Sequence, residues 1–312
     1  MRTATEGSRP GRIVAFGNQK GGVTKTSTVV NLAAALAEQG NRVLVWDLDV
    51  NCGSTRLFGL PGEINVYGTY EVMTGEELAR DVIVHPGDFE EVSLPEGVHL
   101  IPAHTKLEGV EIALAAKHGP FAASHDALRE PLAQIAGDYD YIFLDTSPSM
   151  TPPTKAAYMA AQYFVLTAVP ERLAIEGLVN AVRYIGHAHS GGNSDLRLMG
   201  VVMNQVPGRI TTLARTLLEK VDHLFEGDDP YRKPFKTTIT QSTIVPSVQQ
   251  SGRTLFEAAP DHKVTDLYRE LAREFTERFA ALEGDRIQPQ PRPEQQPTSP
   301  FNADTSTEVT HG

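Results

Sequence analysis

A glycine-rich run between an apolar segment and an amphipathic one constrains the fold of this chain more than any other feature. Residues 13–16 are apolar, residues 17–28 read Gly-Asn-Gln-Lys-Gly-Gly-Val-Thr-Lys-Thr-Ser-Thr, and residues 29–37 form an amphipathic stretch. This order predicts a strand, a phosphate-binding loop and a helix, which is the context in which such a loop can hold a polyphosphate.

Apolar runs alternate with helical patterns along the rest of the chain. Runs that are apolar throughout are typical of strands buried on both faces, and their alternation with helices is typical of α/β folds. The sequence therefore predicts a doubly wound, mostly parallel sheet flanked by helices, with the site at the carboxyl ends of the strands. Strands are predicted at 13–16, 43–46, 98–101, 141–144, 163–168 and 199–203, with 235–239 as a candidate edge strand, and helices at 27–39, 107–116, 123–136, 154–161, 175–188 and 211–225.

The last helix and the chain ends define the expected domain. Apolar residues recur at three- and four-residue steps from 264 to 282, and Asp261 is the expected cap of this helix. A chain of 312 residues suits one large α/β domain. We expect a flexible N-terminus at 1–11, a folded domain at 12–284 and a disordered tail, rich in Pro, Gln, Ser and Thr, at 285–312.

Composition narrows the classes of function. Cys52 is the only cysteine, so the chain can form neither an internal disulfide nor a cysteine metal cluster. No apolar run approaches a membrane span, and residues 1–12 lack an apolar signal core, so we expect a cytoplasmic protein. The formal net charge of −11 argues against a broad basic surface for nucleic acid but leaves room for a local patch.

The residues of the predicted loop suit a nucleotide. Gly21 and Gly22 let backbone N–H groups face a polyphosphate. Lys25 can reach the β and γ oxygens, and the hydroxyl group of Thr26 can bind Mg²⁺. A ligand-free Gly-Gly turn is the alternative, but it would not need this full set of lysines and hydroxyl groups. The predicted nucleotide-binding residues of the loop are Lys20, Gly21, Gly22, Val23, Thr24, Lys25, Thr26 and Ser27.

The loop departs from the standard phosphate-binding pattern. That pattern requires glycine at positions 19 and 24, where this chain has Gln19 and Thr24. The loop fits the deviant form x-K-G-G-x-x-K-[ST] instead, and it closely resembles the deviant-Walker ATPases of the ParA/MinD superfamily, the ParA partitioning branch most of all. That branch usually has glycine where Thr24 stands. Because a β-branched residue tolerates positive φ badly, we expect a negative φ at Thr24, the alternative being weakened nucleotide binding.

Acidic residues follow two of the predicted strands. Asp47 and Asp49 follow the strand at 43–46, and Asp145 follows the strand at 141–144. The resemblance implies that Asp49 positions or activates the attacking water, that Asp145 is the Walker B acid that supports Mg²⁺, and that Asp47 faces Mg²⁺-bound waters or the loop. Acids that only end a strand or cap a turn are the alternative. The family's Pro-Gln-Gly-Asn is replaced by Val-Asn-Cys-Gly at 50–53, which leaves the water geometry open.

Two further residues of the predicted site depend on the resemblance. It implies that Lys20 crosses a dimer interface to the partner's phosphates, which would couple dimerisation to ATP binding. Asn204 ends the strand at 199–203, and its amide suits an adenine edge, although a plain strand-end turn is the alternative. Residues 237–256 resemble the segment that wraps the nucleotide. The predicted catalytic residues are Lys20, Lys25 and Asp49, and the predicted metal site comprises Thr26, Asp47 and Asp145.

Basic residues in the C-terminal third lie where ParA-like proteins place a DNA-binding patch. Contacts of this kind to phosphates would be non-specific and salt-sensitive. Solvated surface charges are the alternative. The candidates are Arg209, Arg215, Lys220, Arg232, Lys233 and Lys236.

The resemblance covers about residues 12–282 and implies an ATP-dependent partitioning ATPase with ATP and Mg²⁺ as cofactors. Such a protein forms a homodimer on binding ATP, binds double-stranded nucleoid DNA without sequence preference, and hydrolyses ATP when a ParB-like centromere-binding protein or a cargo adaptor stimulates it. An ATP-gated scaffold with little hydrolysis is one alternative. A MinD-like membrane switch is another, but the polar C-terminal tail lacks the amphipathic helix that this class needs, so we expect no membrane partner.

Overall fold

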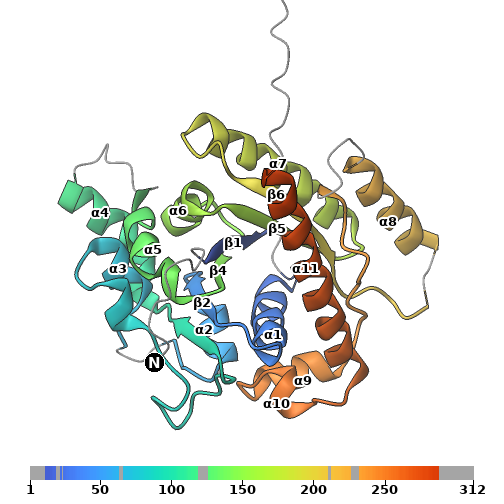
Figure 1. Cartoon of the computed structure of the whole chain (residues 1–312), viewed down its shortest axis with the longest axis horizontal. Coiled ribbons are helices and arrows are strands. Elements are labelled where there is room, and N and C mark those ends of the chain that lie inside the picture. The colour runs from blue at the N-terminus through green and yellow to red at the C-terminus, as the bar shows by residue number, and fades with distance from the viewer. Residues whose placement is uncertain are drawn as a thin grey trace, which may run out of the picture.

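A six-stranded sheet with all strands parallel forms the centre of the molecule (Figure 1). The computed structural model describes residues 11–18, 22, 24–62, 66–118, 126–209, 212–225 and 232–287. The order of the strands is β3-β2-β4-β1-β5-β6, so the fold class predicted from the sequence is confirmed. The strands are β1 (Arg12–Gly17), β2 (Val43–Leu48), β3 (Val98–Ile101), β4 (Tyr141–Thr146), β5 (Tyr163–Ala168) and β6 (Arg197–Met203).

Helices cover both faces of the sheet and bury a separate apolar core on each. In β1, Ile13 and Ala15 point into one core, whereas Val14 and Phe16 point into the other. This division explains why the strands read as continuous apolar runs. One core is covered by α1 (Lys25–Glu38), α9 (Ile244–Gln250), α10 (Leu255–Ala258) and α11 (Lys263–Ile287), and the other by α3 (Thr69–Thr74), α4 (Val110–His118), α5 (Arg129–Ile135), α6 (Pro152–Ala160), α7 (Arg172–Ser190) and α8 (Thr212–Leu224).

Two predicted helices are shorter in the structure than in the sequence pattern. The pattern at 107–116 corresponds to a 3₁₀ turn, Thr105–Gly109, followed by α4. The pattern at 123–136 corresponds to α5 and a further 3₁₀ turn, Ala136–Asp138, and its first residues lie outside the described part of the chain. Short 3₁₀ segments are frequent at both ends of α-helices, and an apolar period cannot distinguish them from an α-helix.

The predicted edge strand at 235–239 does not form. The N–H groups of Phe235 and Ile239 donate to carbonyl groups of β6, at 2.8 and 2.9 Å. Between them, however, the N–H groups of Lys236 and Thr237 donate to the carboxylate of Glu274 in α11, at 2.8 and 2.9 Å. Because those two donors are used by a side chain, the segment lies along β6 without a regular ladder.

Arg278 of α11 completes the attachment of this segment. Its guanidinium donates to the carbonyl oxygens of Met199, Lys233 and Pro234 at 3.0, 2.8 and 2.7 Å. A Cβ atom at Gly200, where φ is +136°, would lie 2.4 Å from its Nη1 atom, so the close approach requires glycine. The segment is thus held between β6 and α11.

The ends of α11 differ slightly from the prediction. The helix begins at Lys263, and the Nδ1 atom of His262 accepts the N–H of Val264 at 3.1 Å, so His262 takes the capping place predicted for Asp261. The helix extends to Ile287, past the predicted boundary at 284. Residues 1–10 and 288–312 lie outside the described part, so the flexible N-terminus and the disordered tail stay predictions. Among the described helices, none is both long and apolar enough to cross a bilayer.

Candidate nucleotide site

The N-terminus of α1 follows β1 and faces the carboxyl edge of the sheet. The first turn of this 14-residue helix contains no acidic residue, and the side chain of Thr24 makes no capping hydrogen bond. The exposed N–H groups and the helix dipole at such an end favour an anion. The described part of the loop therefore fits a phosphate group.

Thr24 itself corrects one expectation, because its φ is +58° rather than negative. Both the N–H and the hydroxyl group of Thr28 donate to the carbonyl oxygen of Thr24, at 2.9 Å each. These bonds start α1 directly after the loop, and Gly22 also has a positive φ of +80°. The turn from β1 into α1 thus imposes the left-handed conformation, although a β-branched residue disfavours it. Lys20, Gly21 and Val23 lie outside the described residues, so their roles stay predictions.

Two fully buried carboxylates lie side by side next to this helix. Asp47 of β2 and Asp145 of β4 are partners in the register of the parallel strands, and neither is exposed. Lys25 forms an ion pair with the Oδ1 atom of Asp145. Burial, and then the charge of Asp145, raise the pKa of Asp47 well above its ordinary value. When both acids are ionised, the single ammonium group of Lys25 leaves one negative charge that a further cation would neutralise.

The helix α2 (Gly53–Leu57) holds both acids in place. The hydroxyl group of Ser54 donates to the Oδ2 atom of Asp145 at 2.6 Å. The N–H and the hydroxyl group of Thr55 donate to the Oδ2 atom of Asp47 at 2.9 and 2.7 Å. Asp47 therefore anchors α2, and its predicted contact with Mg²⁺-bound water stays a prediction.

Thr26 lies in the same cluster. Its Oγ1 atom lies 3.5 Å from the Nζ atom of Lys25, and a Cβ atom at Gly53 would lie 3.0 Å from that oxygen. The structure thus brings Lys25, Thr26 and Asp145 together, and their roles towards ATP and Mg²⁺ stay predictions. Sequence reasoning missed Ser54 and Thr55; their position after the Asp47–Asp49 pair was the available signal.

Asp49 lies at the same edge and is buried. Its Oδ1 atom accepts hydrogen bonds from the N–H and the side-chain amide of Asn51, at 3.0 and 2.9 Å. This turn fixes the carboxylate next to Cys52, whose φ is +54°. Among the described residues, the non-glycine residues with positive φ are Thr24, Cys52 and Gln205, and each follows a strand at this edge. Clustered backbone strain of this kind is typical of functional sites.

A cavity of about 130 Å³ continues the site beyond the first turn of α1. Asn204 lines it, and its amide nitrogen donates to the hydroxyl group of Thr28 at 3.1 Å. Gln249 of α9 donates from its side chain to the hydroxyl group of Ser27. The segment at 237–256 thus borders the predicted nucleotide site, as the resemblance implied. The cavity is lined by Thr24, Ser27, Asn204, Gln205, Ile239, Thr240, Gln241, Ser242, Val245, Pro246, Gln249 and Tyr268.

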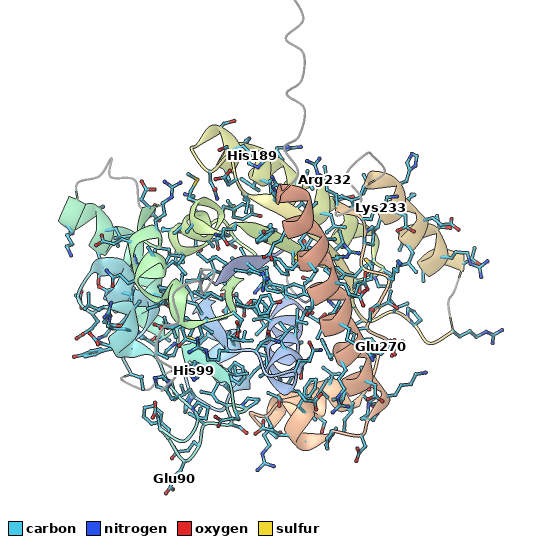
Figure 2. All side chains as sticks on the ribbon, viewed as in Figure 1. Glu90, His99, His189, Arg232, Lys233 and Glu270 are labelled. Atoms are coloured by element: carbon cyan, nitrogen blue, oxygen red, sulfur yellow. The ribbon has the colours of Figure 1, made fainter. Side chains whose placement is uncertain are left out.

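The candidate DNA-binding residues lie on a different part of the surface. Figure 2 shows Arg232 and Lys233 near the C-terminal half of α11, on the side of α8. Lys233 and Lys236 are exposed on the segment that Glu274 and Arg278 hold against β6. Arg209 is exposed after β6, and Arg215 and Lys220 are exposed on α8. Their role in DNA binding stays a prediction.

Comparison with known proteins establishes the family. The family model described as "AAA domain" matches residues 11–198. The chain is 35% identical over 263 residues to the chromosome-partitioning ATPase Soj of Thermus thermophilus, covering 84% of this chain and 94% of that protein. It is 30% identical over 267 residues to the sporulation initiation inhibitor protein Soj of Bacillus subtilis, covering 85% and 98%. The chain belongs to the ParA family of ATPases.

Solved structures share the fold of this chain. A cobyrinic acid a,c-diamide synthase from Mycobacterium smegmatis with bound ADP and magnesium has a TM-score of 0.70 and 28% identity, covering 86% of this chain and 96% of that one. The ATP complex of a variant of Cyanothece McdA also has a TM-score of 0.70, and at 18% identity it shows the likeness of the fold alone, over 89% of this chain and 98% of that one.

As a ParA-family ATPase, the chain uses ATP and Mg²⁺. The described residues fit both groups. The N-terminus of α1 and Lys25 suit the phosphates, while Thr26 and Asp145 would supply the hydroxyl and carboxylate oxygens that Mg²⁺ prefers. When bound there, the metal would neutralise phosphate charge. Sequence reasoning missed Gln249 and Tyr268, because the residues of the cavity come from segments far apart in the chain.

Proposed function

We propose that this ParA-family ATPase is a partitioning ATPase that forms an ATP-sandwich dimer, binds DNA without sequence preference, and hydrolyses ATP when a centromere-binding or adaptor partner stimulates it. The observation that supports the proposal most is the assembly of Lys25, Thr26, Asp145 and Asp49 at one edge of the sheet. The relative from Thermus thermophilus is named a chromosome-partitioning ATPase, which supports the partitioning part.

Charge at the site supports a contribution from a second subunit. Lys25 is already paired with Asp145, and Asp47 is buried beside that pair. A triphosphate brings further negative charge, so a second lysine would stabilise the charge that develops as the terminal phosphate leaves. Lys20, next to the glycine pair, is the residue that we assign to this contact across the dimer.

Nucleotide binding is tested with Lys25→Ala. Loss of the ammonium group should abolish binding of a fluorescent ATP analogue, because Lys25 is the cation at the N-terminus of α1. Lys155→Ala is the matched control, since Lys155 is exposed on α6. Retained affinity in Lys25→Ala would refute the assignment of the phosphate loop.

Dimerisation is tested by light scattering with a non-hydrolysable ATP analogue. The parent protein should become a dimer, and Lys20→Ala should impair this step or hydrolysis without lowering the melting temperature of the monomer. Asp49→Ala should give a stable dimer with ATP itself, because the group that we assign to the attacking water is lost. A parent protein that stays monomeric, or an unaffected Lys20→Ala variant, would contradict the sandwich.

DNA binding is tested with Arg209→Ala combined with Lys236→Ala. Loss of two phosphate contacts should weaken binding to unrelated duplexes alike and reduce the slope of log K against log salt by about 2. Lys155→Ala serves again as the control. Unchanged binding would place the DNA surface elsewhere.

ATP turnover separates the two candidate functions. Turnover by the parent protein that stays negligible with DNA and partner present would favour the ATP-gated scaffold instead.

A further inference from the structure

The first three residues of α2 each contact a different residue of the ATP site. The backbone of Gly53 lies against Thr26, Ser54 donates to Asp145 at 2.6 Å, and Thr55 donates to Asp47 at 2.7 Å. The side chains of Ser54 and Thr55 are buried, as are both acids. Because α2 follows β2 directly, this short helix connects β2, β4 and the start of α1.

Asp145 divides its two oxygens between two partners in the described part of the chain. Lys25 binds Oδ1, and Ser54 binds Oδ2. Lys25 is also the residue that we expect to bind the phosphates. If its ammonium group turns towards a triphosphate, its contact with the Asp145 carboxylate weakens. The hydrogen bond from Ser54 goes to Oδ2, so it does not compete with the binding of phosphate by Lys25. It can therefore keep the carboxylate oriented whether or not Lys25 remains in contact.

We infer that Ser54 is a positioning residue of the magnesium site: its hydroxyl group fixes the orientation of Asp145, so that Oδ1 faces Lys25. It is not a catalytic residue, because it acts through Asp145. The inference depends on the ATP site alone and not on the proposed dimer or on DNA binding. Partners of this kind, one step away from the metal, typically contribute 10- to 100-fold to metal affinity.

A merely structural role makes a different prediction. If the bond between Ser54 and Asp145 only attached α2 to β4, its loss would lower the melting temperature of the nucleotide-free protein but leave the Mg²⁺ requirement unchanged. A positioning role predicts a shift in Mg²⁺ dependence without an equal loss of metal-free nucleotide binding. The two roles are therefore distinguished by titrating Mg²⁺ rather than by measuring turnover.

The experiment uses Ser54→Ala in the full chain, with a fluorescent ATP analogue bound at rising Mg²⁺ concentration and in EDTA. We expect the Mg²⁺ concentration for half-maximal enhancement of binding to rise by about 10-fold or more, while affinity in EDTA stays within about 2-fold. Ser54→Cys keeps the size of the side chain with a weaker donor and should fall between the parent and Ser54→Ala. It also tests the inference if Ser54→Ala does not fold.

Ser93→Ala is the matched control. Its hydroxyl group also donates to a carboxylate, that of Glu257, which accepts its other hydrogen bonds from Thr254 rather than from residues of the ATP site. It should leave the Mg²⁺ titration unchanged. A half-saturating Mg²⁺ concentration in Ser54→Ala within 2-fold of the parent, or an equal shift in Ser93→Ala, would overturn the inference. Failure of the parent protein to bind the analogue would instead contradict the ATP site itself.

Discussion

Replacing Thr24 with glycine should stabilise the nucleotide-free protein, because Thr24 has a φ of +58° just before α1. A left-handed conformation costs an L-residue about 1–2 kcal/mol. Glycine avoids this cost but loses about 0.5–1 kcal/mol through the greater entropy of its unfolded chain. Both bonds from Thr28 go to the carbonyl oxygen of residue 24, which glycine keeps. With both costs near the middle of their ranges, the net gain should be about 0.5–1 kcal/mol.

Thermal unfolding without nucleotide measures this gain. For a domain of this size, about 0.5–1 kcal/mol corresponds to a rise of about 1–4 °C in melting temperature. Thr24→Ala is the matched control, because alanine shortens the side chain but keeps the Cβ atom that the left-handed conformation disfavours. If Thr24→Gly melts no higher than Thr24→Ala, the conformation of Thr24 is not strained and the reasoning fails.

Three further predictions concern residues of β5, β3 and α11. Thr167→Val should raise the free energy of unfolding by about 1 kcal/mol, because the Thr167 hydroxyl group is buried and has no hydrogen-bond partner within the described residues. A lower free energy of unfolding in urea would contradict this reasoning. Burial, and then the charges of His85 and Arg42, lower the pKa of His99 to about 4. The unfolded chain therefore gains this proton first. Because the ring is partly exposed and screened by solvent, we discount the shift and expect a loss of about 1–2 kcal/mol of stability as pH falls from 6.5 towards 4. His99→Gln should reduce this loss in melting curves, and an unchanged loss would exclude His99 as its cause. Arg278→Met should lower the free energy of unfolding by about 2–4 kcal/mol, because three main-chain carbonyl groups lose their donor. Hydrogen exchange in the segment at 233–239 should become faster. Unchanged exchange there would refute its attachment by Arg278.

Much of the fold could be predicted from the sequence, because the strands read as apolar runs that only a sheet covered on both faces can bury. The glycine-rich run after the first strand predicted the phosphate loop, and Asp47 and Asp145 were recognisable because each ends such a run. These signals are local: a strand, a loop and a helix follow one another in the chain. The family resemblance depended on the same residues.

The local patterns failed in two places, where the folded chain imposes other hydrogen bonds or another backbone conformation. The segment at 235–239 has an apolar pattern typical of a strand, but the carboxylate of Glu274 takes two of its N–H groups, so no ladder forms. Thr24 has a residue type that disfavours positive φ, but the turn from β1 into α1 imposes it. In both places, bonds made in the folded chain outweigh a preference of less than a few kcal/mol.

The sequence by itself determined the parallel α/β fold and singled out the candidate residues for the phosphates and the metal, because these follow from the hydrophobic pattern and from what ends each strand. Only the tertiary structure decided how those residues are held. The bonds from Ser54 to Asp145 and from Gln249 to Ser27 join segments 91 and 222 residues apart. No local pattern encodes such a pair, since side-chain hydrogen bonds depend on where the packed helices place their donors.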